Sequence, residues 1–172
     1  MRRLSFGLAA ALSAVLACSA AAGDSPRFPI GLYNVNAPEH LKEIRDAGFD
    51  SFIGEAPDAE GFDALAKEAE KLGLRMMIWP SHFKGPISRT KNWPLEAWYL
   101  ADEPEINGIT PDALKAQSER LRTEDPRLQT FVLGSGAPAK DYGQLADIVM
   151  LDWYPVPHKK LGTVAEQIDR AR

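Results

Sequence analysis

Trp98-Tyr99-Leu100-Ala101-Asp102-Glu103-Pro104-Glu105 is the stretch that decides the fold class of this 172-residue chain. The apolar run that ends at Ala101 is typical of a buried strand. It stops abruptly in three carboxylates and a proline, and proline cannot continue a β-ladder. Acidic residues directly after a buried strand lie where (β/α)8 barrels place their chemistry, at the carboxyl ends of the strands. The stretch therefore favours a barrel of parallel strands.

Strand and helix patterns alternate along the rest of the chain, beyond residue 27. Six strands are expected, at residues 28–35, 49–54, 74–79, 97–101, 129–134 and 147–154. Amphipathic helices are expected between or after them, at residues 38–47, 58–72, 110–124, 141–146 and 163–172. Residues 80–94 are expected to form a long loop with at most a helical turn. Gly48 and Gly73 stand at helix ends, where a left-handed cap is favoured.

This alternation predicts a parallel sheet covered by helices, with modules of about 18 to 32 residues, the pitch of a (β/α)8 TIM barrel. The competing open sheet would carry a glycine-rich phosphate turn after its first strand. The stretch Val35-Asn36-Ala37-Pro38 is no such turn. Six modules cannot close an eight-stranded barrel, so we predict a barrel truncated after about six βα modules. A half-barrel whose open edges are buried by dimerisation is the alternative.

Residues 1–23 have the pattern of an export signal, so the folded domain is expected to comprise residues 24–172. Arg2 and Arg3 precede an apolar stretch from Leu4 to Ala17, which is too short for a confident membrane span. The stretch Val15-Leu16-Ala17-Cys18 resembles a bacterial lipobox. That resemblance implies a lipid on Cys18 and a lipoprotein anchored to a bacterial membrane, in the periplasm or on the outer membrane. Ordinary cleavage after Ala22 would instead give a secreted protein.

Composition excludes some partners and cofactors. The formal net charge is −4, 45% of residues are apolar, and no run of Lys or Arg occurs, so nucleic acid is not a predicted partner. His82 and His158 lack the carboxylate or cysteine spacing of a metal site, so no metal is predicted. No phosphate-binding loop, zinc motif or nucleophile elbow occurs, and no cofactor is expected.

Acids, amides and aromatic residues follow the predicted strands, and in a parallel barrel these positions share one rim. Aromatic rings stack on sugar faces and carboxylates bond to hydroxyl groups, so a carbohydrate is the predicted ligand. Glu55 is a further acid of the rim. The residues predicted to bind the substrate are Asn34, Trp79, His82, Asp102, Asp152 and Tyr154.

The triplet Asp102-Glu103-Pro104 resembles the fourth-strand motif of the clan A (β/α)8 glycoside hydrolases, which reads Asn-Glu-Pro or Asp-Glu-Pro. The resemblance implies a glycosidase with a retaining mechanism, in which Glu103 is the catalytic general acid/base. Asp102 would take the place of the Asn that holds the sugar 2-hydroxyl, with loss of an amide donor. The family's nucleophile, a Glu after strand seven, has no counterpart in this chain.

Three alternatives stay open beside the glycosidase. One is a carbohydrate-binding or scaffold lipoprotein that keeps the barrel without catalysis. Another is a barrel lyase or isomerase acting on a sugar acid, which would need a metal or a basic residue at the rim. In the last, the stretch from Asp102 to Glu105 is only a solvated turn that caps the next helix.

Overall fold

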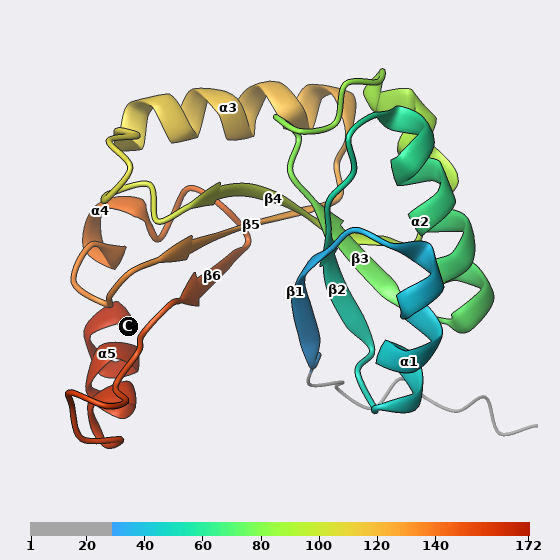
Figure 1. The fold of residues 1–172 in the computed structure, drawn as a ribbon. Helices are drawn as coiled ribbons and strands as arrows, with labels where there is room; N and C mark the ends of the chain where they lie inside the picture. The colour runs from blue at the N-terminus through green and yellow to red at the C-terminus, as the bar shows by residue number, and fades with distance from the viewer. Residues whose placement is uncertain (1–28) are drawn as a thin grey trace, which may run out of the picture.

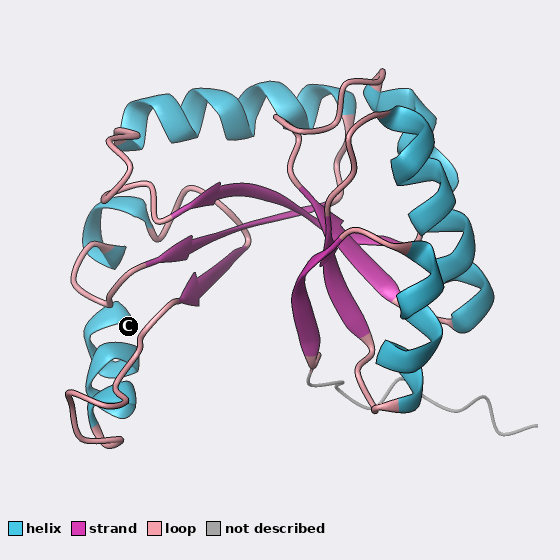
Figure 2. Ribbon diagram, in the orientation of Figure 1, coloured by secondary structure: helices cyan, strands magenta, loops and turns pink. Residues whose placement is uncertain are grey.

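A computed structural model describes residues 29–172, which form one curled sheet of six parallel strands in the order β1-β2-β3-β4-β5-β6 (Figure 1). Helices cover the outer, convex face of the sheet, and its inner, concave face is open (Figure 2). The strands are β1 (Gly31–Val35), β2 (Ser51–Gly54), β3 (Arg75–Ile78), β4 (Leu95–Asp102), β5 (Leu128–Leu133) and β6 (Ile148–Leu151). The helices are η1 (Pro38–His40), α1 (Leu41–Asp46), α2 (Ala59–Leu72), η2 (Ile87–Asn92), α3 (Pro111–Glu124), α4 (Ala139–Tyr142) and α5 (Thr163–Ala171).

This architecture confirms the predicted fold class, since it consists of six βα modules of a (β/α)8 barrel. Every strand pairs in parallel with its neighbour in the sequence. Each connection therefore returns the chain across the outer face, where the helices lie (Figure 1). All carboxyl ends of the strands consequently meet at one edge of the sheet.

Local sequence explains where the two long helices begin and end. The Asp58 carboxylate accepts a 2.8 Å hydrogen bond from the amide of Gly61, which caps α2. Gly73 closes that helix with φ +65°, a left-handed conformation that costs glycine little. The Thr110 hydroxyl caps α3 in the same way, and Pro111 occupies its first turn.

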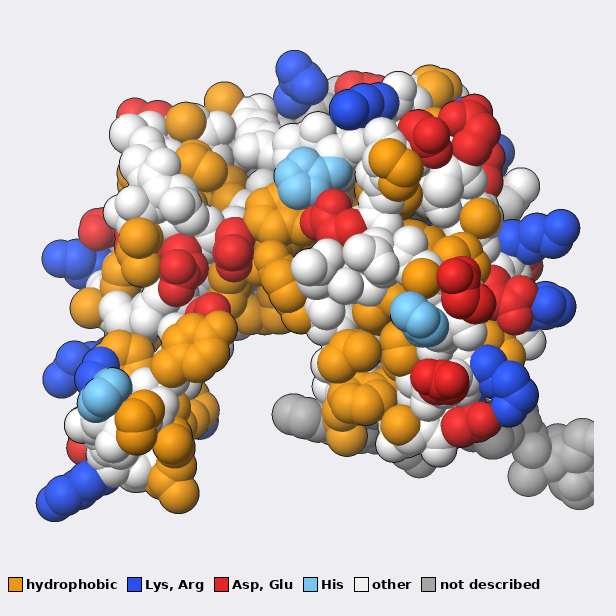
Figure 3. All heavy atoms as spheres, in the orientation of Figure 1, with side chains coloured by type: hydrophobic (Ala, Val, Ile, Leu, Met, Phe, Trp, Pro, Cys, Tyr) orange, Lys and Arg blue, Asp and Glu red, His pale blue; other side chains and the backbone are white. Residues whose placement is uncertain are grey.

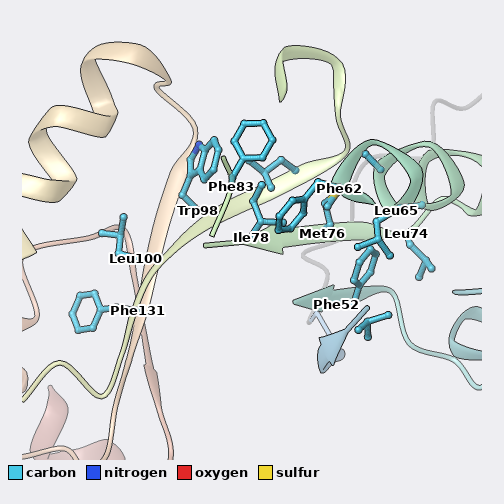
Figure 4. Close-up of a cluster of buried hydrophobic side chains, with 14 of the residues drawn as sticks. Phe52, Phe62, Leu65, Leu74, Met76, Ile78, Phe83, Trp98, Leu100 and Phe131 are labelled. Atoms are coloured by element: carbon cyan, nitrogen blue, oxygen red, sulfur yellow. The ribbon is translucent and has the colours of Figure 1, made fainter. Parts of the chain in front are cut away.

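The hydrophobic core lies between the outer face of the sheet and the helices (Figure 4). Along α2, Phe62, Leu65, Ala66 and Ala69 are buried at helical spacing. They pack toward side chains of β2, β3 and β4 that share the outer face, which are Phe52, Met76, Ile78 and Trp98. Alternation along these strands leaves the intervening residues on the inner face.

A buried polar cluster fixes the amino-terminal half of β4 to the segment before β5. The indole Nε1 of Trp98 donates a 3.0 Å hydrogen bond to Oδ2 of Asp125, whose carboxylate is also held by the Arg127 guanidinium. Arg127 reaches on to the carbonyl of Thr90 at 3.0 Å. Burial raises the pKa of Asp125, but the hydrogen bonds from Arg127 and Trp98 outweigh it and hold that pKa below its ordinary value.

The predicted elements are found, with shifts at their ends. The expected helix 38–47 divides into η1 and α1, and the loop 80–94 contains η2. The expected helix 141–146 is α4, which ends at Tyr142 before Gly143. The last strand ends at Leu151 rather than at residue 154, because Asp152 donates the final hydrogen bond to the Leu133 carbonyl and the chain then leaves the sheet.

The predicted export signal and Cys18 lie outside the described residues, so both stay predictions. In the part of the chain that the structure describes, none of the helices combines the length and the apolar character needed to cross a bilayer.

Candidate functional site

The end of β4 carries the most unusual backbone of the rim. Glu103 has φ +41°, in the left-handed region that residues other than glycine rarely adopt. Its amide donates a 2.9 Å hydrogen bond to the Val132 carbonyl, and its own carbonyl accepts from the amides of Ile106 and Asn107. Strained conformations of this kind persist only where the surrounding structure enforces them, and they are concentrated at functional sites.

Asp102 is tied to the inner face of the sheet by Tyr99. The Tyr99 hydroxyl donates a 2.8 Å hydrogen bond to Asp102 Oδ1, and only 2% of Tyr99 is exposed. Burial is the main cause that raises the pKa of Tyr99, and the hydrogen bond to the Asp102 carboxylate raises it further. The hydroxyl therefore stays protonated and remains a donor. Asp102 keeps Oδ2 for another partner.

Asp152 and Tyr154 form a similar pair after β6. The Tyr154 hydroxyl donates a 2.9 Å hydrogen bond to Asp152 Oδ2, and 75% of Tyr154 is exposed. Trp153 does not join them. Its indole Nε1 instead donates a 3.0 Å hydrogen bond to the Thr163 hydroxyl, and Lys159 lies over its ring. Between the two aromatic residues, Tyr154 is therefore the one at the rim.

The Asp102 and Asp152 pairs border one cavity of about 360 Å³ on the inner face near the rim. Tyr33 of β1 also borders it, and its ring meets that of Tyr99 edge to face at 6.4 Å. Apolar residues of the inner face complete the lining, among them Ile53, Val132 and Met150. In Figure 3, hydrophobic side chains line the inside of the arch and acidic side chains gather at its upper part.

Trp79 and His82, which follow β3, contact this group from the side. The His82 Nδ1 lies 2.9 Å from Oε2 of Glu55, the residue after β2. The rings of Trp79 and His82 stack at 4.9 Å, and Trp79 meets Tyr99 at 4.4 Å. The structure therefore brings residues that follow β2 and β3 together with Tyr99 of β4, although neither Trp79 nor His82 lines the cavity.

Asn34 is exposed on β1 and has φ +60°, the second left-handed residue other than glycine among residues 29–172. Its neighbour Tyr33, which the sequence analysis missed, is the β1 residue that lines the cavity. Glu105, one of the three carboxylates after the predicted fourth strand, was expected only at the surface. Its Oε1 accepts a 2.8 Å hydrogen bond from the amide of Gly134, at the end of β5.

Negative charge dominates this rim. Burial raises the pKa of Glu103, and the carboxylates of Asp152, Asp102 and Glu105 raise it further. Among residues 29–172, no Lys or Arg forms an ion pair with Asp102, Glu103 or Asp152. No three His, Cys, Asp or Glu side chains in this range are grouped to hold a metal ion. The rim thus offers carboxylates and aromatic rings.

Comparison with known proteins relates this chain to others by fold alone. No family model matches the sequence, and no curated protein matches it. Among solved structures, the tryptophan synthase alpha subunit from Campylobacter jejuni is similar, with a TM-score of 0.54 and 16% identity over 82% of this chain. The alignment covers 64% of that subunit, so the chain spans less than two thirds of its length. An HpcH/HpaI aldolase from Desulfitobacterium hafniense gives a TM-score of 0.47 at 13% identity, covering 83% of this chain and 72% of the aldolase.

These findings correct the prediction of a clan A glycoside hydrolase with a retaining mechanism. The tryptophan synthase alpha subunit, which shares the fold, is named a synthase, and no family model or curated protein matches the chain to support a glycosidase. The physical reason is the shortness of the motif. The (β/α)8 fold itself places functional acids after its strands, so Asp102-Glu103-Pro104 indicates the fold and its functional edge without specifying the reaction.

Proposed function

We propose that this chain belongs to a barrel-type enzyme other than a glycosidase, in which Glu103 transfers a proton to and from a small substrate bound at the rim. The observation that carries the proposal is the state of Glu103. It combines a left-handed backbone with a carboxyl group whose pKa is raised. A carboxyl group that holds its proton closer to neutral pH is suited to general acid/base work.

The surroundings of Glu103 support the same role. The Glu103 carboxylate packs against Gly134, where a larger residue would meet it. The cavity beside Asp102 is large enough for a small molecule and lies at the carboxyl ends of the strands, where barrel enzymes act. The tryptophan synthase alpha subunit, whose fold is similar, is named as a subunit of an enzyme, which agrees with the proposal.

The acidic rim argues against one of the earlier alternatives. A lyase or isomerase acting on a sugar acid would have to bind a carboxylate substrate. His82, the basic side chain that follows β3 at this rim, is already paired with Glu55. Like charges repel at short range, so the rim favours a neutral or cationic substrate.

The test must not assume a substrate. The purified protein is incubated with a library of small metabolites in D₂O, and deuterium uptake and new products are followed by NMR and mass spectrometry. For any compound that reacts, Glu103→Gln is expected to lower the rate by about 10² or more, the range of general acid/base loss. Glu119→Gln, on the exposed surface of α3, is the matched control and should leave the rate unchanged. An unchanged rate in Glu103→Gln, or no reaction with any compound, would contradict the proposal.

A further inference from the structure

The cavity bordered by Tyr33, Tyr99 and Tyr154 has a chemical character that the proton-transfer role alone does not explain. Three aromatic rings surround it, from β1, from β4 and from the segment after β6. Two aspartates, Asp102 and Asp152, also line it. Aromatic rings and carboxylates are the groups that proteins combine around organic cations.

The hydrogen bonds within the cavity leave one oxygen free on each aspartate. Tyr99 occupies Oδ1 of Asp102, and Tyr154 occupies Oδ2 of Asp152. Both tyrosine hydroxyls act as donors in these bonds, so the remaining carboxylate oxygens, Asp102 Oδ2 and Asp152 Oδ1, can accept only from another donor. A ligand that brings several N–H groups would satisfy them.

Within residues 29–172, the negative charge of the cavity is not balanced by an ion pair. Neither aspartate forms an ion pair with a Lys or Arg among residues 29–172, and Glu103 adds a third carboxylate nearby. The other carboxylates of the rim are Glu55, which pairs with His82, and Glu105, which bonds to the Gly134 amide. The pKa of Tyr33 is raised mainly by burial, and that of Tyr154 mainly by its hydrogen bond to Asp152. Nearby carboxylates raise both pKa values further. Both rings therefore lie within the negative field of these acids.

We infer that the cavity binds a small primary amine in its ammonium form, with the nitrogen between Asp102 and Asp152 and the carbon atoms against the tyrosine rings and the apolar floor. A primary ammonium has three N–H donors, enough to supply one to each free carboxylate oxygen. A quaternary ammonium has the charge without the donors, and an alcohol has a donor without the charge. This inference rests on the proposed function, since it names the substrate class of the same site.

Binding of benzylamine, measured by calorimetry at neutral pH with the whole chain, tests the inference without any need for turnover. Its neutral analogue benzyl alcohol is expected to bind at least about tenfold more weakly, a difference of about 1.4 kcal/mol. Benzyltrimethylammonium should bind between the two, and glucose, which represents the predicted carbohydrate ligand, more weakly than the amine. Equal binding of amine and alcohol, or tighter binding of glucose, would overturn the inference.

Variants separate the contributions of charge and ring. Asp152→Asn should weaken benzylamine binding by about tenfold and leave benzyl alcohol unaffected, whereas Asp169→Asn, an exposed substitution on α5, should change neither. Tyr154→Phe keeps the ring and should retain most of the affinity, while Tyr154→Ala should lose it. Unchanged amine binding in both Asp152→Asn and Tyr154→Ala would place the amine elsewhere.

The two proposals can fail separately. Glu103-dependent turnover of a neutral compound, without amine binding, would overturn the inference and leave the proton-transfer role standing. The opposite result is also possible: the protein binds benzylamine in a way that depends on Asp152 but reacts with no compound of the library. That result would support the inference and contradict the proposed proton-transfer role.

Discussion

The carboxylate of Glu103 lies directly above Gly134, so that a β-carbon built on Gly134 would come within 2.9 Å of Glu103 Oε1 and 2.6 Å of the end of Ile106. The glycine at the end of β5 therefore decides where the carboxylate after β4 can rest. Its amide also donates to Glu105, which fixes the second acid of the same turn.

Gly134→Ala is expected to displace Glu103 and Ile106, because the added methyl group would occupy their space. Both atoms are the ends of flexible side chains that can move aside, so the free energy of unfolding should change by less than about 1 kcal/mol, while the Glu103-dependent rate should fall. Gly162→Ala is the matched control. Nothing lies within 4 Å of a β-carbon there, so a change of less than about 1 kcal/mol is expected on chemical denaturation. Equal effects of the two substitutions on the Glu103-dependent rate would contradict this account of Gly134.

Glu103→Gln should stabilise the protein near neutral pH. The folded protein holds the proton of Glu103 more tightly than the unfolded chain does, since its pKa is raised on folding. Well below the unfolded pKa, Glu103 is protonated in both states and its ionisation does not affect the free energy of unfolding. That free energy falls as the pH rises through the folded pKa, because the folded protein must then hold an unfavourable charge. The thermal midpoint of Glu103→Gln should exceed that of the parent at about pH 7 and approach it at about pH 3. A gain that is the same at both values would exclude the charge as its cause.

Asp125→Ala should destabilise the protein far more than its position in a loop suggests. The substitution leaves the Trp98 indole without its acceptor and removes the carboxylate partner of the Arg127 guanidinium, which keeps only Thr90, and Asp125 is only 5% exposed. We expect a loss of about 3 kcal/mol. The folded pKa of Asp125 is lowered, so its contribution is complete above the unfolded pKa and is lost as the pH falls through the folded value. Asp46→Ala, in an exposed ion pair with Lys42, should cost less than about 1 kcal/mol.

A protein of residues 29–172 is expected to associate with itself. Among these residues β1 and β6 each pair with a single strand, and unpaired strand edges recruit other chains. Leu32 on β1 and Ile148 on β6 are exposed by 39% and 38%. Replacing both with Lys should shift sedimentation profiles toward the monomer. A parent protein that is already a monomer at all concentrations would contradict the expectation.

The lipid anchor on Cys18 remains a prediction of the sequence. If Val15-Leu16-Ala17-Cys18 is a lipobox, Cys18 carries a diacylglycerol group, and the mature protein fractionates with membranes. Mass spectrometry of the mature protein should then show a lipid-sized increment on Cys18, and Cys18→Ala should release the protein or block its processing. A free amino terminus near Gly23 would instead indicate a soluble exported protein.

Local patterns predict much of the fold. Helical spacing along α2 and the cap at Gly73 depend on residues close in sequence, and the structure confirms both. The contact between Trp98 and Asp125, 27 residues apart, was not predicted, because it depends on how α3 returns the chain to the sheet. The end of β6 was placed too late for a related reason, since pairing with β5 and not composition ends that strand.

The candidate site was predicted in part. Asp102 and Asp152 were placed at one rim by the expected strand ends, and they border the same cavity. Tyr99 was assigned only to the strand, although its alternation with Trp98 puts it on the inner face, and this signal could have identified it. Tyr33 could not be singled out in the same way, since it lies in β1, far from Tyr99 in sequence. The reaction was predicted wrongly from a triplet that many barrels could carry.

The walls of the cavity differ in stability because they come from different positions in the six-stranded sheet. Tyr99 and Asp102 belong to β4, which has a paired strand on each side, whereas Tyr33 belongs to the edge strand β1 and Asp152 follows the edge strand β6. Amide hydrogen exchange should therefore be slowest in β4 and β5 and fastest toward the two edges, where local opening needs the fewest contacts to break. A ligand held between these walls would connect β1 to β6 across the hollow of the arch. Its binding would then slow exchange at both edges together, although they are the strands farthest apart in the sheet.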